Sequence, residues 1–224
     1  MALQALDHDL WVIDHPLRVG GLALGTRTTV VRLGDGGLAL LSPGPLADDD
    51  AAAIGALGPV RALVAPNLMH HLHLAAARAR FPEARLHAPA ALAKKQPALR
   101  IDAAPSALPG GDALAVIAVG GMPRLEEHAF VHRRSRTLIL TDLVFNLRAP
   151  APWLTRSFMR LNGGFDRFGP TRLCRSLVRH RAAVRAGIDR ILDEDFDRVV
   201  VAHGRVLADG GRQALAAGFA WLSA

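Results

Sequence analysis

The chain has 224 residues, half of them hydrophobic, which is enough for one domain with a buried core. Its single cysteine, Cys174, excludes an internal disulfide and a cysteine-rich zinc site. No apolar run is long enough to cross a bilayer, and the first residues lack the pattern of a signal peptide. We therefore expect a cytoplasmic protein without a membrane partner.

The formal net charge of +7 comes almost wholly from arginine, and basic residues are densest between Arg156 and Arg190. A basic face can recruit anionic substrates or nucleic acid. However, the chain has no tyrosine and only 5% aromatic residues, which argues against a surface for base stacking. We interpret the arginines mainly as a bias of composition. Nucleic-acid processing by the segment 156–190 stays open as the least favoured function.

The first half of the sequence predicts short strands, a hairpin and a strand–turn–helix unit. Four residues at 34–37 (GDGG) mark the hairpin, because glycine accepts the positive φ that such turns need. Three aspartates at 48–50 favour the start of a helix over 51–57. Strands are expected at 10–13, 28–33, 38–42, 60–65 and 85–87. A second helix should run from the turn at 66–67 to about residue 81, and a short third one over 90–95.

The second half predicts strands at 114–119, 129–131, 137–140 and 198–202, after a loop over 96–112. Residues 146–169 are expected to be irregular, as a lid or an oligomer contact. A single long helix over 170–192 carries an apolar stripe, and a last helix covers 212–222. No linker divides the chain, so residues 1–224 should form one domain, with two facing sheets and helices outside.

Potential metal ligands recur where predicted strands end. His70, His71 and His73 follow the strand at 60–65, Asp142 follows 137–140, and His203 follows 198–202. Ligands in α/β sheets gather at the carboxyl ends of strands, so these groups can share one rim. Imidazole and carboxylate together suit zinc, iron or manganese. A catalytic zinc site uses about three protein ligands and lowers the pKa of water to about 7.

Each of these residues also has a purely structural explanation. The adjacent histidines can be a polar cap at a helix start, with Asn67 capping the same helix. Asp142 can cap a turn, and His203 can lie in a strand-end turn. Glu126 and Glu127 are expected to be solvated charges at a strand start, with a role as partner of a ligating histidine as the alternative. The signal is therefore the recurrence of such groups at equivalent strand ends.

The order of elements, with TLILTDLVF and RVVVAHG near its end, resembles the metallo-β-lactamase fold. More closely, the chain is similar to the DUF4336 family of that fold group. The matching segments are distributed over most of the chain, between residues 26 and 207: TRTTVVRLGDGGLALLSP, APNLMHHLHL, RFPEARLHAPAAL, EEHAFVHRRSRTLILTDLVFN and DFDRVVVAHGRVL. The resemblance implies an α/β (α+β) protein built as a four-layer αββα sandwich. It implies no settled activity.

Catalytic members of the fold group carry the motif H-x-H-x-D-H after the strand that corresponds to 60–65. The best-fitting stretch here is 66–71, in which His71 keeps the last histidine and His70 replaces the aspartate. Pro66 and Leu68 replace the first two histidines, and neither can bind a metal. A further histidine, expected after the strand that ends at Val119, would fall in 120–123, where none stands. A complete dinuclear site is therefore not expected.

The resemblance matches Asp142 to the bridging aspartate and His203 to the final histidine. It implies a reduced site of His70, His71, Asp142 and His203, with Asp142 and His71 as the catalytic pair. That set favours one divalent ion, zinc before iron or manganese, or none. The first functional hypothesis is a metal-dependent hydrolase-like protein acting on an ester, a lactone or a similar small substrate. The alternative is an inactive protein that binds a ligand or partner in the old cleft, and a homodimer stays open.

Overall fold

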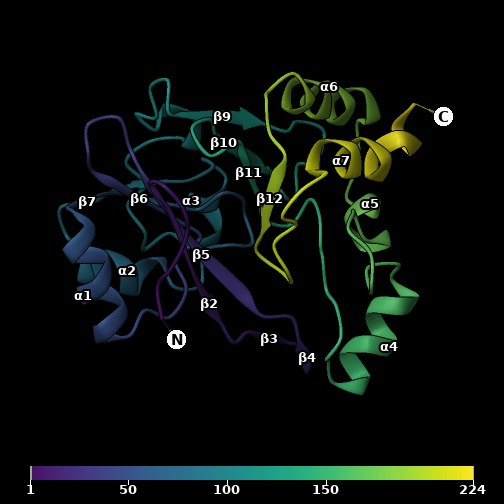
Figure 1. The fold of residues 1–224 in the computed structure, drawn as a ribbon, viewed down its shortest axis with the longest axis horizontal. Helices are drawn as coiled ribbons and strands as arrows, with labels where there is room; N and C mark the ends of the chain where they lie inside the picture. Colours follow the sequence, from purple (N-terminus) through teal and green to yellow (C-terminus); the bar gives the residue numbers. More distant parts are fainter. Residues whose placement is uncertain (1, 224) are drawn as a thin grey trace.

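Two β-sheets face each other in the computed structural model, which describes residues 2–223 (Figure 1). The first sheet has six strands in the order β1-β2-β5-β6-β7-β8, and the second has four in the order β12-β11-β10-β9. A small separate hairpin joins β3 to β4. The strands are β1 (Gln4–Asp7), β2 (Leu10–His15), β3 (Arg18–Val19), β4 (Leu22–Ala23), β5 (Thr26–Arg32), β6 (Leu38–Leu41), β7 (Val60–Val64), β8 (Arg85–His87), β9 (Leu114–Ala118), β10 (His128–His132), β11 (Thr137–Leu140) and β12 (Arg198–Val201).

Helices lie on the outer side of each sheet. The helices α1 and α2 pack with α3 on the first sheet, whereas α6 and α7 pack on the second (Figure 1). The helices are α1 (Asp48–Leu57), α2 (Leu74–Arg80), α3 (Leu92–Lys95), α4 (Trp153–Leu161), α5 (Arg172–Ser176), α6 (Arg181–Leu192) and α7 (Gly211–Phe219), with short 3-10 turns at Pro105–Ala107 and Ala220–Leu222. The predicted four-layer αββα sandwich is therefore confirmed.

The alternation of side chains along each strand explains the layers. On β10, Ala129 and Val131 face the helices, whereas Phe130 between them faces the other sheet. Phe130 packs there with residues of both sheets, including Val12 and Val200. Because neighbouring side chains point to opposite faces, the apolar strand fills two core layers at once.

Two predictions about helices in the second half of the chain are wrong. Residues 146–169 were expected to be irregular but contain α4, whose apolar residues follow no stripe that faces a core. The predicted helix over 170–192 is broken into α5 and α6. It breaks because the amide groups of Arg179 and His180 donate to the carbonyl of Gly121, at 2.9 and 3.2 Å, instead of continuing the helix. Among residues 2–223, no helix is long and apolar enough to span a bilayer.

Phe130 tests the packing between the sheets, because its side chain is almost fully buried. Phe130→Ala should lower the free energy of unfolding by about 3–5 kcal/mol, since it leaves a cavity in a close-packed core. Urea denaturation measures the loss. The matched control is Phe158→Ala on α4, where the ring is exposed and the change should stay within about 0.5 kcal/mol. Equal losses in both variants would contradict the position of Phe130.

Candidate metal centre

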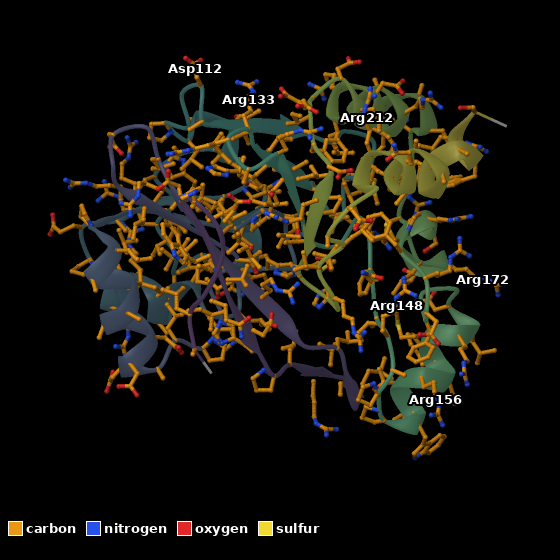
Figure 2. All side chains as sticks on the ribbon, viewed as in Figure 1. Asp112, Arg133, Arg148, Arg156, Arg172 and Arg212 are labelled. Atoms are coloured by element: carbon orange, nitrogen blue, oxygen red, sulfur yellow. The ribbon has the colours of Figure 1, made fainter. Side chains whose placement is uncertain are left out.

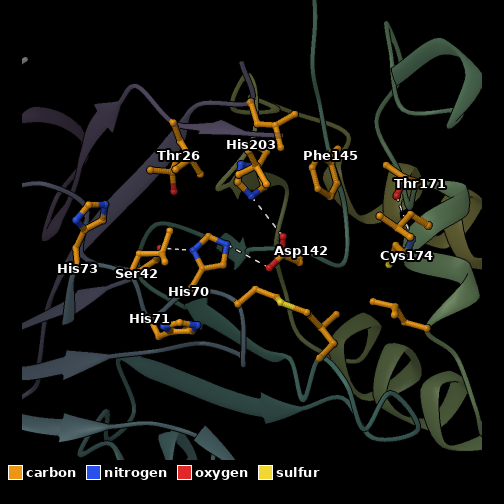
Figure 3. A pocket seen from close by; sticks show the side chains of 18 of the residues that line it. Thr26, Ser42, His70, His71, His73, Asp142, Phe145, Thr171, Cys174 and His203 are labelled. Carbon is orange, nitrogen blue, oxygen red and sulfur yellow. Dashed lines mark hydrogen bonds and ion pairs between the residues drawn. The ribbon is translucent and has the colours of Figure 1, made fainter. Parts of the chain in front are cut away.

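A cleft of about 420 Å³ opens at one edge of the sandwich, where four strands end. Strands β6 and β7 run parallel to each other, as do β11 and β12, so their carboxyl ends meet at this edge. Ser42 follows β6, His70 follows β7, Asp142 follows β11 and His203 follows β12. All four side chains line the cleft (Figure 3). Topology therefore brings together residues that are far apart in the sequence.

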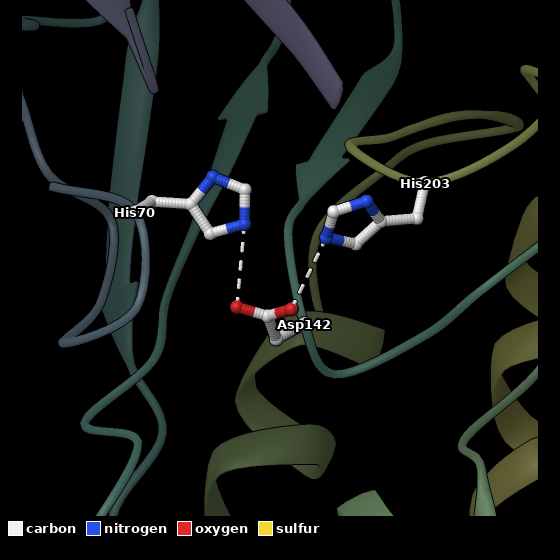
Figure 4. Close-up of side chains that lie close together, drawn as sticks. All are labelled: His70, Asp142 and His203. Carbon is white, nitrogen blue, oxygen red and sulfur yellow. Dashed lines mark ion pairs between the residues drawn. The ribbon is translucent and has the colours of Figure 1, made fainter. Parts of the chain in front are cut away.

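The carboxylate of Asp142 lies between two imidazoles (Figure 4). Its Oδ2 atom is 3.3 Å from Nε2 of His70, and its Oδ1 atom is 3.3 Å from Nε2 of His203. One ligand atom from each of the three residues lies within 4.8 Å of the other two. Both imidazole side chains are nearly buried, at 7% and 6% exposed. The three groups are therefore close enough to share one cation.

The outer nitrogens of both rings are held by neighbouring loops. Nδ1 of His203 lies 2.7 Å from the carbonyl of Gly25, which can only accept, so this nitrogen carries the proton. Nδ1 of His70 lies 2.5 Å from the hydroxyl of Ser42, which can accept in the same way. The Nε2 lone pair of neutral His203 then faces Asp142, and so does that of His70 where the Ser42 hydroxyl accepts. Such a contact between lone pairs and a carboxylate requires a proton or a metal ion between them.

Asn67 joins the loop that carries His70 to the loop that carries Asp142. Its side-chain carbonyl accepts from the amide groups of Met69 and His70, at 2.7 and 2.9 Å. Its amide nitrogen lies 2.7 Å from Oδ2 of Asp142 and 2.5 Å from Oε2 of Glu127, and it donates to both. Asn67 is fully buried, so these bonds are protected from water. Asn67 thus fixes the direction of His70. The sequence suggested that Asn67 caps the helix, but α2 begins after His73.

Glu127 is fully buried behind Asp142, which corrects its interpretation as a solvated charge. Its Oε1 atom accepts from the amide and hydroxyl groups of Thr141, at 2.8 and 2.7 Å, and from the Asp142 amide at 3.2 Å. Burial, followed by the nearby Asp142 charge, raises the pKa of Glu127 to about 7. Glu127 supports the Asp142 loop and contacts no histidine of the cluster directly.

The pKa values of His70 and Asp142 reflect their proximity. Burial alone would lower the pKa of His70, but the Asp142 carboxylate outweighs it and raises that pKa above its usual value. Burial alone would raise the pKa of Asp142, whereas the two imidazoles lower it far below its usual value. The cluster therefore keeps Asp142 ionised and attracts a positive charge.

The three histidines that follow β7, His70, His71 and His73, point to different parts of the cleft. His70 points to Asp142, whereas His71 and His73 line other parts of the cleft (Figure 3). His71 does not belong to the group of three ligand atoms within 4.8 Å. Burial, with the Lys95 charge second, lowers its pKa and favours the neutral imidazole. Helix α2 begins only at Leu74, so the prediction that these histidines lie in its first turn is wrong.

Sequence reasoning missed Arg27, which braces the loop of His203. Its guanidinium donates to the carbonyls of Val201 and Gly204, at 2.5 and 3.0 Å, on either side of that histidine. Asp14 pairs with the same guanidinium at 2.6 Å. Arg27 lies on β5 and is 6% exposed, so it is an arginine buried in a sheet. A buried arginine on a strand is unusual and would have marked Arg27 as a candidate, but the sequence alone does not show that this side chain is buried.

The chain belongs to the family described as "Domain of unknown function (DUF4336)", which matches residues 7–162. None of the curated proteins compared with it is similar at a significant level.

Solved structures share the fold over almost the whole chain. A metallo-β-lactamase from Pontibacter korlensis has a TM-score of 0.65 at 14% identity, covering 99% of this chain and 98% of that one. The FIM-1 metallo-β-lactamase of Pseudomonas aeruginosa, in its mono-zinc form, has a TM-score of 0.63 at 12% identity, with 99% and 95% covered. A metal-soaked flavodiiron core from Synechocystis sp. PCC6803 has a TM-score of 0.65 at 13% identity, covering 99% of this chain and 60% of that one. These likenesses establish the metallo-β-lactamase fold.

The two raised pKa values predict how pH affects the metal-free protein. Protonated His70 stabilises the folded state at pH values below about 6.5, the pKa of histidine in the unfolded chain. This stabilisation is lost as the pH rises through the higher pKa that His70 has in the folded protein. Neutral Glu127 acts in the same direction, and its contribution to stability is lost as the pH rises from 4.5 to about 7. The histidines whose pKa is lowered by burial, such as His15, His87 and His128, act in the opposite direction below about pH 6.5. The free energy of unfolding should therefore fall as pH rises above about 6.5, through the folded pKa of His70.

Urea denaturation at several pH values, with a chelator present, measures this change. His70→Gln should remove the part of the decrease above about pH 6.5. His180→Gln, which changes an exposed histidine outside the cleft, should leave the profile unaltered. A free energy of unfolding that stays flat or rises over this range would contradict the electrostatics of the cluster.

Proposed function

We propose that this chain is a metal-dependent hydrolase-like protein with one divalent ion held by His70, Asp142 and His203. The observation that carries the proposal is the direction of the two Nε2 atoms. Each ring has its Nδ1 atom engaged with an outer partner and turns Nε2 toward the same carboxylate. Outer partners of this kind typically fix the ring and tautomer of a metal-binding histidine.

The donor set fits zinc best. Two imidazoles and one carboxylate are three protein ligands, and a catalytic zinc site has about that number with one position open. Iron and manganese accept the same donors. A divalent ion at this position would polarise a carbonyl group and activate water for hydrolysis. In this chain Ser42 and the Gly25 carbonyl would orient the rings, while Asn67 would orient the carboxylate.

His71 is the proposed general base. It lines the same cleft without joining the cluster, and its lowered pKa keeps the ring neutral and able to accept a proton near pH 7. Its neighbour Lys95 also lines the cleft and donates to the carbonyl of Leu68 at 2.8 Å, which fixes the turn that carries His71. The catalytic pair is therefore Asp142, in the metal centre, and His71 beside it.

The lining of the cleft limits the substrate. Most of it is apolar, and the polar groups concentrate around the cluster. The apolar lining residues are Leu17, Val19, Leu24, Pro43, Met69, Leu72, Leu125, Phe145, Leu173, Cys174 and Leu177. A small ester or lactone with an apolar substituent fits this arrangement, because its carbonyl can approach the cluster while the substituent contacts the walls.

A ligand-binding protein without catalysis is the second candidate. One observation favours it: Pro66 and Leu68 occupy positions where catalytic members of the fold group have metal-binding histidines. The same apolar cleft would then bind a ligand without chemistry. Metal content and hydrolysis, measured separately, distinguish the two candidates.

Metal content tests the proposed ligands. Elemental analysis of protein purified without an affinity tag should find about one zinc, iron or manganese ion per chain. His203→Gln or Asp142→Asn should lose it, because removing one of three ligands leaves too few donors. His71→Gln should retain it. Absence of metal in the unchanged protein, with the same stability before and after chelation, would contradict the metal centre.

Hydrolysis tests the role of His71. Loss of a general base typically lowers the rate by about 10²–10⁴-fold, so His71→Gln should lower kcat to that extent while the metal stays bound. Hydrolysis of aryl esters and lactones with alkyl groups of increasing length provides the measurement. His180→Gln is the control with an unchanged rate. Metal-loaded protein without activity on any of these substrates would instead support the ligand-binding candidate.

A further inference from the structure

The helix α4 presents its apolar side to solvent. It lies at the edge of the fold, away from both helical layers (Figure 1). Trp153 and Leu161 are 71% and 76% exposed, and Leu154 and Phe158 are exposed as well. At 3.6 residues per turn, these four side chains share an arc of about 140° on one side of the helix. Exposed apolar groups concentrated in this way mark an interaction surface.

The opposite side of α4 anchors it to the protein. Met159 is buried in a small cluster with Leu147 and Phe165. Thr155 is fully buried, and its hydroxyl accepts from the amide of Ala23 at 2.9 Å. The apolar arc therefore faces outward because other residues hold the helix in place.

The apolar arc continues toward the mouth of the cleft. Leu154 lies beside Gly21 in the β3–β4 hairpin, which also carries the exposed Val19. At the other end of α4, the side chain of Asn162 accepts from the amide of Leu173, which is exposed. Val19 and Leu173 both line the cleft. The surface thus extends from α4 to two sides of the opening.

Positive charge is concentrated in the stretch of chain that carries this surface. Residues 143–179 contain seven arginines and one acid, Asp166. This stretch therefore accounts for nearly all of the chain's formal net charge of +7. The arginines are Arg148, Arg156, Arg160, Arg167, Arg172, Arg175 and Arg179. Figure 2 shows Arg156 on α4 and Arg172 on α5, with Arg148 on the extended segment next to them. In the part of the chain that the structure describes, none of the seven is paired with a carboxylate.

We propose that α4 and the adjoining rim of the cleft dock on an anionic lipid bilayer. A helix with Trp, Phe and Leu exposed on one side and arginines directly beside them is suited to lie in a membrane interface, with the apolar groups inserted and the cations at the headgroups. The arginines supply the attraction to acidic headgroups. A second copy of this chain would bring the same positive charges to the contact, so a symmetric dimer through this face is disfavoured.

Membrane docking by α4 is independent of the metal centre. It also differs from the expectation of no membrane partner, which rested on the lack of a membrane-spanning run. A peripheral helix needs no such run, since only one side of it enters the headgroup region.

Vesicle flotation tests the proposal with the whole protein. The protein should float with vesicles of phosphatidylcholine and phosphatidylglycerol in equal amounts, and only weakly with phosphatidylcholine alone. The bound fraction should fall as salt is raised, because the attraction is screened. The tryptophan emission should shift to shorter wavelength on binding, because Trp153 is exposed whereas Trp11 and Trp221 are partly buried; variants with Trp11→Phe and Trp221→Phe assign the shift to Trp153. Failure to float with the acidic vesicles at low salt would overturn the proposal.

Paired variants separate docking from nonspecific charge attraction. Arg156→Gln with Arg160→Gln should weaken vesicle binding by about 10- to 30-fold. Phe158→Ser with Leu161→Ser should abolish the shift in Trp153 emission. The control pair, Arg61→Gln with Arg85→Gln, makes the same change of charge on β7 and β8 and should leave binding unaltered.

All the paired variants change exposed side chains, and unchanged thermal unfolding should confirm that they fold. An equal loss of binding in the control pair would overturn docking through α4. So would a dimer in solution that dissociates in the Phe158→Ser, Leu161→Ser variant, because α4 would then be a contact between copies.

Discussion

A largely buried carboxylate between two imidazoles organises the functional edge of this protein. Asp142 is held ionised in surroundings that would otherwise favour its neutral form, and its two oxygens each face one ring. An isolated buried charge costs several kcal/mol, so a compensating positive charge is required. A proton on His70 supplies such a charge, and in the proposed function a divalent ion would supply it instead. Most contacts around the site can be understood as support for this arrangement.

The support comes from both sheets. From the first sheet, Ser42 orients His70, while Arg27 on β5 holds the chain on both sides of His203. From the second sheet, Glu127 accepts from the backbone before Asp142. Asn67 connects the two halves. Because the cluster spans the space between the sheets, sandwich packing and site geometry depend on each other.

Much of the fold was predictable, because apolar runs define strands and their ends. The strands that end near Asp142 and His203 were located to within a residue or two, and the structure places both residues on the same edge. The choice between the adjacent residues His70 and His71 was not predictable. It depends on the side chain of Asn67, which binds the amides of Met69 and His70 and turns the loop. Sequence patterns do not contain such a contact.

Helix α4 escaped prediction for a different reason. Its apolar residues recur at helical spacing, but the glycines at 163–164 and 169 favoured an irregular stretch over all of 146–169. The sequence does not show that this apolar side faces solvent, with only Thr155 and Met159 buried. The break between α5 and α6 depends on Gly121, some sixty residues earlier in the chain. Local sequence could not reveal the exposure of α4 or the break after α5, since both depend on distant parts of the chain.

The most direct test of the metal centre is a crystal structure of the protein with zinc, using data collected at the zinc absorption edge. The structure predicts one anomalous peak at about 2.0–2.2 Å from Nε2 of His70, Nε2 of His203 and a carboxylate oxygen of Asp142. A cluster without a peak, or a peak coordinated by His71 in place of His70, would contradict this account.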